Sequence, residues 1–279
     1  MFYYNNWDKF CKAIIKSGVH VCSAEESLKL STEERFIVLK HDVEASVINA
    51  YKLAAIEYKY GICGSYYVQA YLMLDRKNIC LLKEMQSWGH EISYHYDVLD
   101  AHEGDYKAAE EDFIKYSNIF LENGFHYSTI CQHGNPIKKR IGYTSNRDFF
   151  RNPEIRSHYP DLVDMVVDYS KHIGGRKYRY ISDAGYQWNI ITEPETNDLH
   201  PEVKNVKIGG FKNLLNLLMN SEYSYVVSTH PHRWVSVAWK INLKIIIFRI
   251  IREFVMIIRH IPGIEWLLNK FYFLAKKYK

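Results

Sequence analysis

Histidine and carboxylate side chains gather directly after several short apolar runs of this sequence. The clusters are Lys40-His41-Asp42-Val43-Glu44, His95-Tyr96-Asp97, Gln132-His133-Gly134-Asn135, Ser182-Asp183-Ala184-Gly185 and Ser228-Thr229-His230-Pro231-His232. Imidazoles and carboxylates bind Zn²⁺ and similar divalent ions, and they are also the usual general acids and bases. The pattern therefore predicts a hydrolytic site that is assisted by a metal ion, with Asp183 among the candidate catalytic residues.

The apolar runs that precede these clusters have the length and composition of buried strands. They cover residues 36–39, 64–68, 91–94, 127–131, 162–167, 178–181 and 223–227, with amphipathic stretches between several of them, the clearest at 106–120. Strands that alternate with helices predict an α/β fold with a largely parallel sheet. The carboxyl ends of parallel strands open on one face, so we expect the polar clusters to meet there.

Further residues near these strand ends suit a sugar ligand. Segment 136–160 reads as a long loop over one rim, and its Arg147 and Arg151 could bind an acidic group such as a uronate or a phosphate. His133 is a candidate substrate contact, although a turn explains its sequence equally well. Trp188 and Trp234 could stack on a sugar ring, and burial in the core is the alternative for both.

Three of the segments resemble the motifs of polysaccharide deacetylases, carbohydrate esterase family 4 with the NodB-homology fold. Lys40-His41-Asp42-Val43-Glu44 is similar to the first motif, and Gly89-His90-Glu91-Ile92-Ser93-Tyr94-His95 to the second. Ser228-Thr229-His230-Pro231 is similar to the late strand that ends in a catalytic His. The resemblance covers roughly residues 36 to 234 and implies a (β/α) barrel that removes an N-acetyl group from a sugar with the help of a metal, most simply Zn²⁺.

The resemblance also assigns roles to individual residues. It implies that Asp42 and His95 are metal ligands, and that His230 is the general acid that protonates the leaving amine. The metal would polarise the amide carbonyl and lower the pKa of a bound water. The product would enter the synthesis of a cell-surface polysaccharide.

Two positions depart from the family pattern. His41 stands where the family has its base aspartate, so we expect His41 to be the base, with a second metal ligand or a partner of Asp42 as its other possible roles. The second ligand His of the family falls at Leu99, which cannot bind a metal. The third ligand is then Asp97, His102 or Glu44, of which Asp97 is our choice.

Charge divides the chain into an acidic body and a basic tail. Residues 235–279 hold nine Lys/Arg and two Asp/Glu, a balance of +7, whereas the whole chain carries +4. Leu243, Ile246, Ile247, Ile250, Phe254 and Ile257 share one face of a predicted helix there. We therefore expect a deacetylase-like barrel over 1–234 and a basic amphipathic helical extension over 235–279. Segment 236–279 is predicted to contact a membrane surface, or alternatively to cover the barrel or a second subunit.

The remaining composition limits the classes of function and location. No basic stripe crosses the body, so nucleic acid is not expected as a partner. Five cysteines without Cys-x-x-Cys spacing indicate reduced thiols, and the first residues lack the pattern of a secretion signal. We expect a cytoplasmic protein that acts on a sugar or glycan, with a peripheral position at the inner face of the cell membrane as the alternative. A catalytically silent sugar-binding or scaffold barrel is the competing hypothesis.

Overall fold

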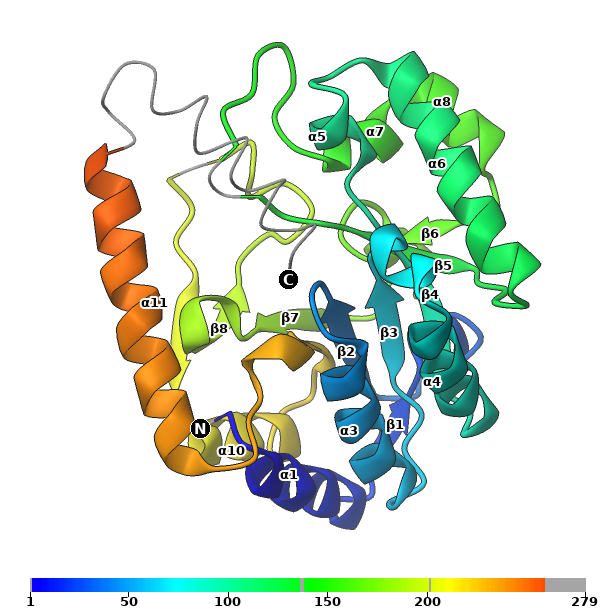
Figure 1. Cartoon of the computed structure of the whole chain (residues 1–279). Coiled ribbons are helices and arrows are strands. Elements are labelled where there is room, and N and C mark those ends of the chain that lie inside the picture. The colour runs from blue at the N-terminus through cyan, green and yellow to red at the C-terminus, as the bar shows by residue number, and fades with distance from the viewer. Residues whose placement is uncertain (1, 136–137, 201, 259–279) are drawn as a thin grey trace.

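The computed structural model describes residues 2–135, 138–200 and 202–258, and its architecture is mixed α/β (Figure 1). Ten strands form one sheet in the order β6-β5-β4-β3-β2-β10-β7-β8-β9, with β1 paired to β2 beside this path. The strands are β1 His20–Cys22, β2 Phe36–Val43, β3 Ser65–Val68, β4 Glu91–Tyr96, β5 Thr129–Gln132, β6 Val163–Asp164, β7 Tyr178–Ser182, β8 Trp188–Ile191, β9 Val206–Gly209 and β10 Ser224–Thr229. The predicted α/β class is confirmed.

The sheet curls into a barrel that is only partly closed. Pairing is parallel from β6 through to β7, and β8 and β9 add an antiparallel meander beyond β7. Within the described ranges no ladder joins β6 to β7, so the parallel part has a seam between two strands that are consecutive in the chain. The coarse prediction of a curled parallel sheet is thus correct, and its full closure is not seen.

Helices occupy most of the connections between strands. They are α1 Tyr4–Lys16, α2 Ala24–Ser27, α3 Val47–Tyr58, α4 Arg76–Ser87, α5 Val98–Ala101, α6 Tyr106–Glu122, α7 Arg147–Arg151, α8 Pro153–His158, α9 Tyr169–His172, α10 Phe211–Met219 and α11 Ala238–Ile258, with short 3₁₀ turns at Ala70–Leu74, Ala184–Tyr186 and Pro231–Arg233. Side-chain caps fix several helix starts: the Ser46 side chain accepts from the Asn49 N–H, and the Asp105 carboxylate from two N–H groups of α6.

Strand β2 is the centre of the sheet and is longer than predicted. All eight of its residues are buried, and it pairs with β10 along one edge and with β1 and then β3 along the other. The sequence places its end at Leu39 because charged residues follow, but the ladder continues to Val43. Side chains alternate between the two faces of a strand, so Lys40 and Asp42 share one face and His41 lies on the other.

The two faces of the curled sheet have different surroundings. A cluster with Phe36, Val38, Tyr67, Cys131 and Tyr180 fills the inside of the curl. Two larger clusters lie between the outer face and the helices, one of them around α1 and α10 and the other around α4 and α6. The inner face is therefore apolar at the amino ends of the strands and becomes polar toward their carboxyl ends.

One predicted segment differs from the structure, and another is described only in part. The long loop 136–160 holds two short helices, α7 and α8, in its described part. The predicted tail helix is present as α11, whereas the rest of the predicted helical extension, from 259 to 279, lies outside the described residues. Across the described ranges, no helix has both the length and the hydropathy needed to cross a membrane.

Candidate functional site

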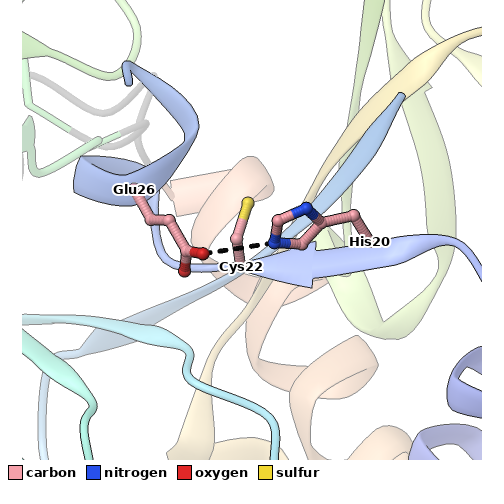
Figure 2. Close-up of side chains that lie close together, drawn as sticks. All are labelled: His20, Cys22 and Glu26. Atoms are coloured by element: carbon pink, nitrogen blue, oxygen red, sulfur yellow. Dashed lines mark hydrogen bonds and ion pairs between the residues drawn. The ribbon is translucent and has the colours of Figure 1, made fainter. Parts of the chain in front are cut away.

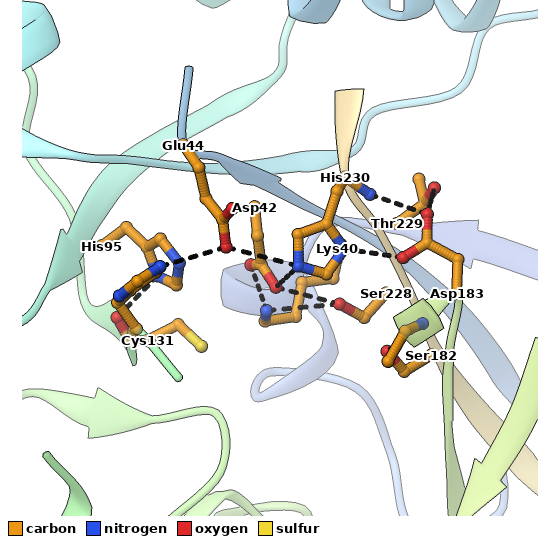
Figure 3. Close-up of polar contacts among 12 residues, drawn as sticks. Lys40, Asp42, Glu44, His95, Cys131, Ser182, Asp183, Ser228, Thr229 and His230 are labelled. Carbon is orange, nitrogen blue, oxygen red and sulfur yellow. Dashed lines mark hydrogen bonds and ion pairs between the residues drawn. The ribbon is translucent and has the colours of Figure 1, made fainter. Parts of the chain in front are cut away.

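A cavity of about 700 Å³ lies at the carboxyl ends of the parallel strands. Its lining includes Asp42, Glu44, His95, His133 and His230, which come from four predicted clusters. Figure 3 shows the side chains of Asp42, Glu44, His95 and His230 converging from the ends of β2, β4 and β10. Asp183, after β7, lies behind His230. The expectation that these strand ends meet is confirmed by their geometry.

Strand β2 supplies one wall of the cavity through alternate residues. Lys40 is buried, and its ammonium group is paired with Asp42 Oδ1. The Ser228 hydroxyl donates to Asp42 Oδ2 over 3.1 Å. Burial raises the pKa of Asp42, but Lys40 and the neighbouring imidazoles outweigh burial and lower this pKa to about 2. Asp42 is therefore a carboxylate whose two oxygens already have partners.

Glu44, His95 and His133 form a set of three possible metal ligands. One donor atom of each lies within 4.8 Å of the others, and His133 Nε2 is 3.3 Å from Glu44 Oε1. His95 Nδ1 lies 3.0 Å from the Cys131 carbonyl, which can only accept, so this nitrogen carries the proton and Nε2 has the free lone pair. Burial lowers the pKa of His95 to about 4, which keeps its ring neutral, as metal binding requires.

Asp42, His95 and Cys131 form an alternative set with the same separation. Burial raises the pKa of the Cys131 thiol well above its usual range, so the sulfur keeps its proton at neutral pH. The Asp42 carboxylate in this set also faces the Lys40 ammonium. A metal ion bound here would have to displace the Lys40 ammonium from Asp42 and the proton from the Cys131 thiol. The set formed by Glu44, His95 and His133 therefore fits a divalent metal better.

His230 is held against a buried carboxylate on the opposite wall. Its Nδ1 lies 2.6 Å from Asp183 Oδ1, and the Asp183 oxygens also accept from the Thr229 hydroxyl, the His230 N–H and the Arg233 guanidinium. His230 Nε2 consequently faces the cavity, 3.5 Å from Glu44 Oε1 and 3.9 Å from Asp42 Oδ2. Burial and Arg233 lower the pKa of His230, but Asp183 and Glu44 outweigh them and raise it to about 9.

His41 lies on the other side of the sheet, which corrects its expected role as base. Its ring stacks on Tyr66 with centroids 4.2 Å apart, and its Nε2 is 2.9 Å from Glu57 Oε1. Trp7 donates to the same carboxylate oxygen, and Tyr66 donates to Glu57 Oε2. His41 is fully buried under α1 and α3, so it cannot reach a substrate in the cavity.

Both tryptophans are core residues, so the expectation that they stack on a sugar is also wrong. Trp188 and Trp234 are exposed by 0% and 1%. Phe2 contacts both rings, with centroids 5.4 Å and 5.3 Å away, and Trp7 packs edge-on against Trp234. The alternative reading of these residues, burial in the core, is the one that the structure supports.

The three residues predicted as possible third ligands occupy different places in the structure. Glu44 joins the convergent set, whereas Asp97, which comes directly before α5, is absent from the ligand sets found among the described residues and does not line the cavity. His102 points elsewhere, with Nε2 at 2.8 Å from Asp112 Oδ2. Leu99 is buried in an apolar cluster. The prediction that Asp97 is the third ligand is therefore wrong.

The two loop arginines are anchored by acidic neighbours. Arg147 lines the cavity, and its Nη1 donates to Asn197 and Asp198 over 2.9 Å each, while its buried Nε has no partner. Arg151 donates to Asp148 and Asp198 and does not line the cavity. Of the two, only Arg147 is placed to contact a ligand.

Lys40 and Gln132 also line the cavity, although sequence reasoning assigned neither of them a role there. Lys40 stands two positions before Asp42, so the period of a strand would have found it had β2 been predicted at full length. Gln132 ends β5 and is 9% exposed, and its side-chain oxygen has no hydrogen-bond partner. Gln132 belongs to a predicted polar cluster, but no signal in the sequence assigned its amide a role in the site.

A second group of possible ligands lies away from the cavity, on β1 and α2 (Figure 2). His20 Nδ1 is 2.5 Å from Glu34 Oε1, and His20 Nε2 is 3.2 Å from Glu26 Oε1. Glu34, chiefly, raises the pKa of His20, and burial raises the pKa of the Cys22 thiol. A charged imidazole between two carboxylates accounts for this group as an ion-pair link between β1 and its neighbours.

Comparisons of the chain with family models, with curated proteins and with solved structures found no match. The geometry of the cavity and the motif resemblance are therefore the grounds on which a function is proposed.

Proposed function

We propose that the cavity hydrolyses the N-acetyl amide of a sugar with the help of a divalent metal. The observation that supports this most is that Glu44, His95 and His133 converge opposite the Asp183–His230 pair inside one cavity. A ligand set for a Lewis acid and a separate proton donor are the two requirements of metal-assisted amide hydrolysis. Of these residues, Glu44, His95 and His230 lie in the three segments that resemble deacetylase motifs, and they follow the order of those motifs.

Glu44, His95 and His133 would hold the metal. Two imidazole nitrogens and one carboxylate oxygen form a donor set that Zn²⁺ accepts, and such a set leaves room for water and substrate. When bound, the metal would supply Lewis acidity toward the acyl oxygen and toward water. The motif resemblance implied that Asp42 is a metal ligand, whereas this proposal assigns it the role of proton acceptor.

The chain's own groups would handle the protons. Asp42, which Lys40 and Ser228 keep ionised with a lowered pKa, would orient the attacking water and accept its proton as a weak base. His230 carries a proton on Nε2 and donates it to the amide nitrogen as the C–N bond breaks, which releases acetate and the free amine. Asp183 fixes the tautomer and the orientation of His230 through Nδ1, as an orienting carboxylate does in other acid–base pairs.

A polyhydroxylated substrate suits the rest of the lining. The Gln132 oxygen is a buried acceptor without a partner, and the Arg147 Nε is a buried donor without one. An unpaired buried polar group costs about 1–3 kcal/mol, which a ligand hydroxyl or phosphate would recover on binding. A cavity of about 700 Å³ is large enough for a small glycan or a nucleotide-linked sugar. The product would feed cell-surface polysaccharide synthesis.

Acetate release from a panel of N-acetylated sugars, free and nucleotide-linked, tests the proposal in the presence of Zn²⁺. His230→Gln should lower kcat by about 10²–10⁴, the usual contribution of a general acid. His102→Gln is the matched control, because His102 pairs with Asp112 outside the cavity. Equal rates for wild type and His230→Gln would refute the mechanism, and no release from the whole panel would refute the function.

A catalytically silent sugar-binding barrel is the second candidate. It is favoured by Lys40, because this ammonium already neutralises the carboxylate that corresponds to the family's metal ligand. A silent barrel would bind the same sugars without releasing acetate and would purify without stoichiometric metal. Gln132→Leu would weaken sugar binding in either case, so metal content and acetate release separate the two candidates.

A further inference from the structure

Helix α11 is attached to the body along one side only. Ile241 is 1% exposed and belongs to the core cluster around α1, and Ile245 packs against the same cluster. Lys244 Nζ donates to the His232 carbonyl over 3.0 Å. Figure 1 shows α11 at the edge of the molecule, on the side away from α4 and α6. These contacts fix which face of the helix points inward.

The outward face of α11 is a stripe of large apolar side chains. Its members recur at helical spacing and are exposed by between 47% and 64%: Trp239, Leu243, Ile246, Ile247 and Ile250. Single exposed apolar residues are ordinary, but a contiguous stripe on one helix marks a surface that is covered in use. We call these five residues the α11 stripe.

Charged residues flank the α11 stripe on both sides, and most of them are basic. At 100° per residue, Lys240 lies next to Ile247 on one border, whereas Glu253 and then Arg249 follow Ile246 on the other; all three are exposed. From 235 to 252 the sequence contains no Asp or Glu, and the first acid is Glu253. The surface that covers the stripe must therefore tolerate cations at its rim, and a negatively charged surface would attract them.

We propose that α11 lies flat on an anionic lipid surface, with the α11 stripe inserted among the acyl chains and Lys240 and Arg249 at the phosphates. An amphipathic helix of this kind buries its apolar face a few ångströms below the headgroups. Trp239 suits that interface, since its ring is apolar and its N–H is polar. A second copy of the stripe is the alternative occupant, and the test below distinguishes it from a lipid surface.

Co-sedimentation of the full chain with vesicles tests this proposal. Binding is expected to vesicles of phosphatidylcholine with 30% phosphatidylglycerol, and to be much weaker with phosphatidylcholine alone. Lys240→Gln/Arg249→Gln should weaken binding to the anionic vesicles by roughly five-fold for each cation removed, and added salt should weaken it in wild type. Equal binding to both vesicle types would overturn the proposal that Lys240 and Arg249 bind lipid phosphates.

Leu243→Ser/Ile246→Ser/Ile250→Ser tests the apolar part and should reduce vesicle binding at least ten-fold. Its matched control is Leu74→Ser/Ile141→Ser, which removes two side chains that are 70% and 83% exposed elsewhere on the surface. Wild-type protein that ignores anionic vesicles would refute the proposal. A wild-type dimer that the triple variant converts to monomer would also refute it, in favour of a second copy. Acetate release is independent of each of these outcomes.

Discussion

His41 and Asp42 are adjacent in the sequence, but their side chains lie on opposite faces of the sheet. The motif resemblance gives them neighbouring roles at one metal, but Asp42 faces the cavity while His41 packs between Trp7 and Tyr66 beside Glu57. Residue types suggested a chemistry for this segment, whereas the direction of each side chain depends on where β2 ends. If the side that one strand residue faces is assigned wrongly, core residues of that strand are mistaken for site residues and site residues for core residues.

Glu57 gives the first residue-scale prediction. It is fully buried, and His41, Trp7 and Tyr66 all depend on its carboxylate. Glu57→Ala should lower the free energy of unfolding by about 3–5 kcal/mol, because it leaves these buried polar groups without their partner. Urea unfolding measures the loss, and Glu57→Gln should lose less because its side-chain oxygen still accepts. A loss below about 1 kcal/mol for the alanine variant would contradict the structural role.

Asp164 gives a prediction on pH. Burial raises its pKa to about 6, although Tyr96 and two backbone N–H groups donate to it. The folded state therefore favours the protonated acid, and the stability that this contributes is present below about pH 4 and is lost as pH rises through 6. Asp164→Asn cannot ionise, so its stability relative to wild type should increase by about 2–3 kcal/mol between pH 4 and pH 8. Urea curves at both pH values check this; a difference that does not vary with pH would disprove it.

At the scale of elements, periodicity predicted the strands well and their ends poorly. The runs that became β2, β3, β4, β5, β7 and β10 were all found, because apolar stretches bounded by polar clusters mark buried parallel strands. The antiparallel β8–β9 pair was missed, since its residues are half-exposed and mixed in polarity. The local sequence does not reveal that β2 continues through Lys40-His41-Asp42, because this part of the strand is formed by pairing with β3 and β10.

Gly64 gives a prediction at this scale, at the entrance to β3. A Cβ there would lie 2.7 Å from Glu57 Oε2 and 3.4 Å from His41 Nε2. Gly64→Ala should therefore lower the free energy of unfolding by about 1–3 kcal/mol through overpacking. Gly134→Ala is the control, because no atom lies within 4 Å of its Cβ position. Thermal unfolding compares the two, and equal melting temperatures would contradict the close approach of β3 to α3.

For the whole molecule, a metal at the proposed set would join separate parts of the sheet. Glu44 follows β2, His95 lies on β4, and His133 follows β5. A ligand that binds only the folded state stabilises it by about 2.7 kcal/mol at a hundred times its Kd. Zn²⁺ should thus raise the Tm of wild type and of His20→Ala, but not of His95→Ala. A shift that persists in His95→Ala and is absent in His20→Ala would move the metal to the group on β1.

The order of the strands also determines when the site can form during synthesis. Ser228 and Asp42 are hydrogen-bonded although they lie 186 positions apart, because β10 inserts between β2 and β7. A nascent chain that has emerged as far as β9 therefore has an unpaired edge on its central strand and no His230 beside Glu44. Contacts this distant in sequence slow folding and leave apolar edges exposed meanwhile. The site and the last two parallel pairings of the sheet, those of β10 with β2 and with β7, are thus completed by a single late event, the docking of Ser224–Thr229.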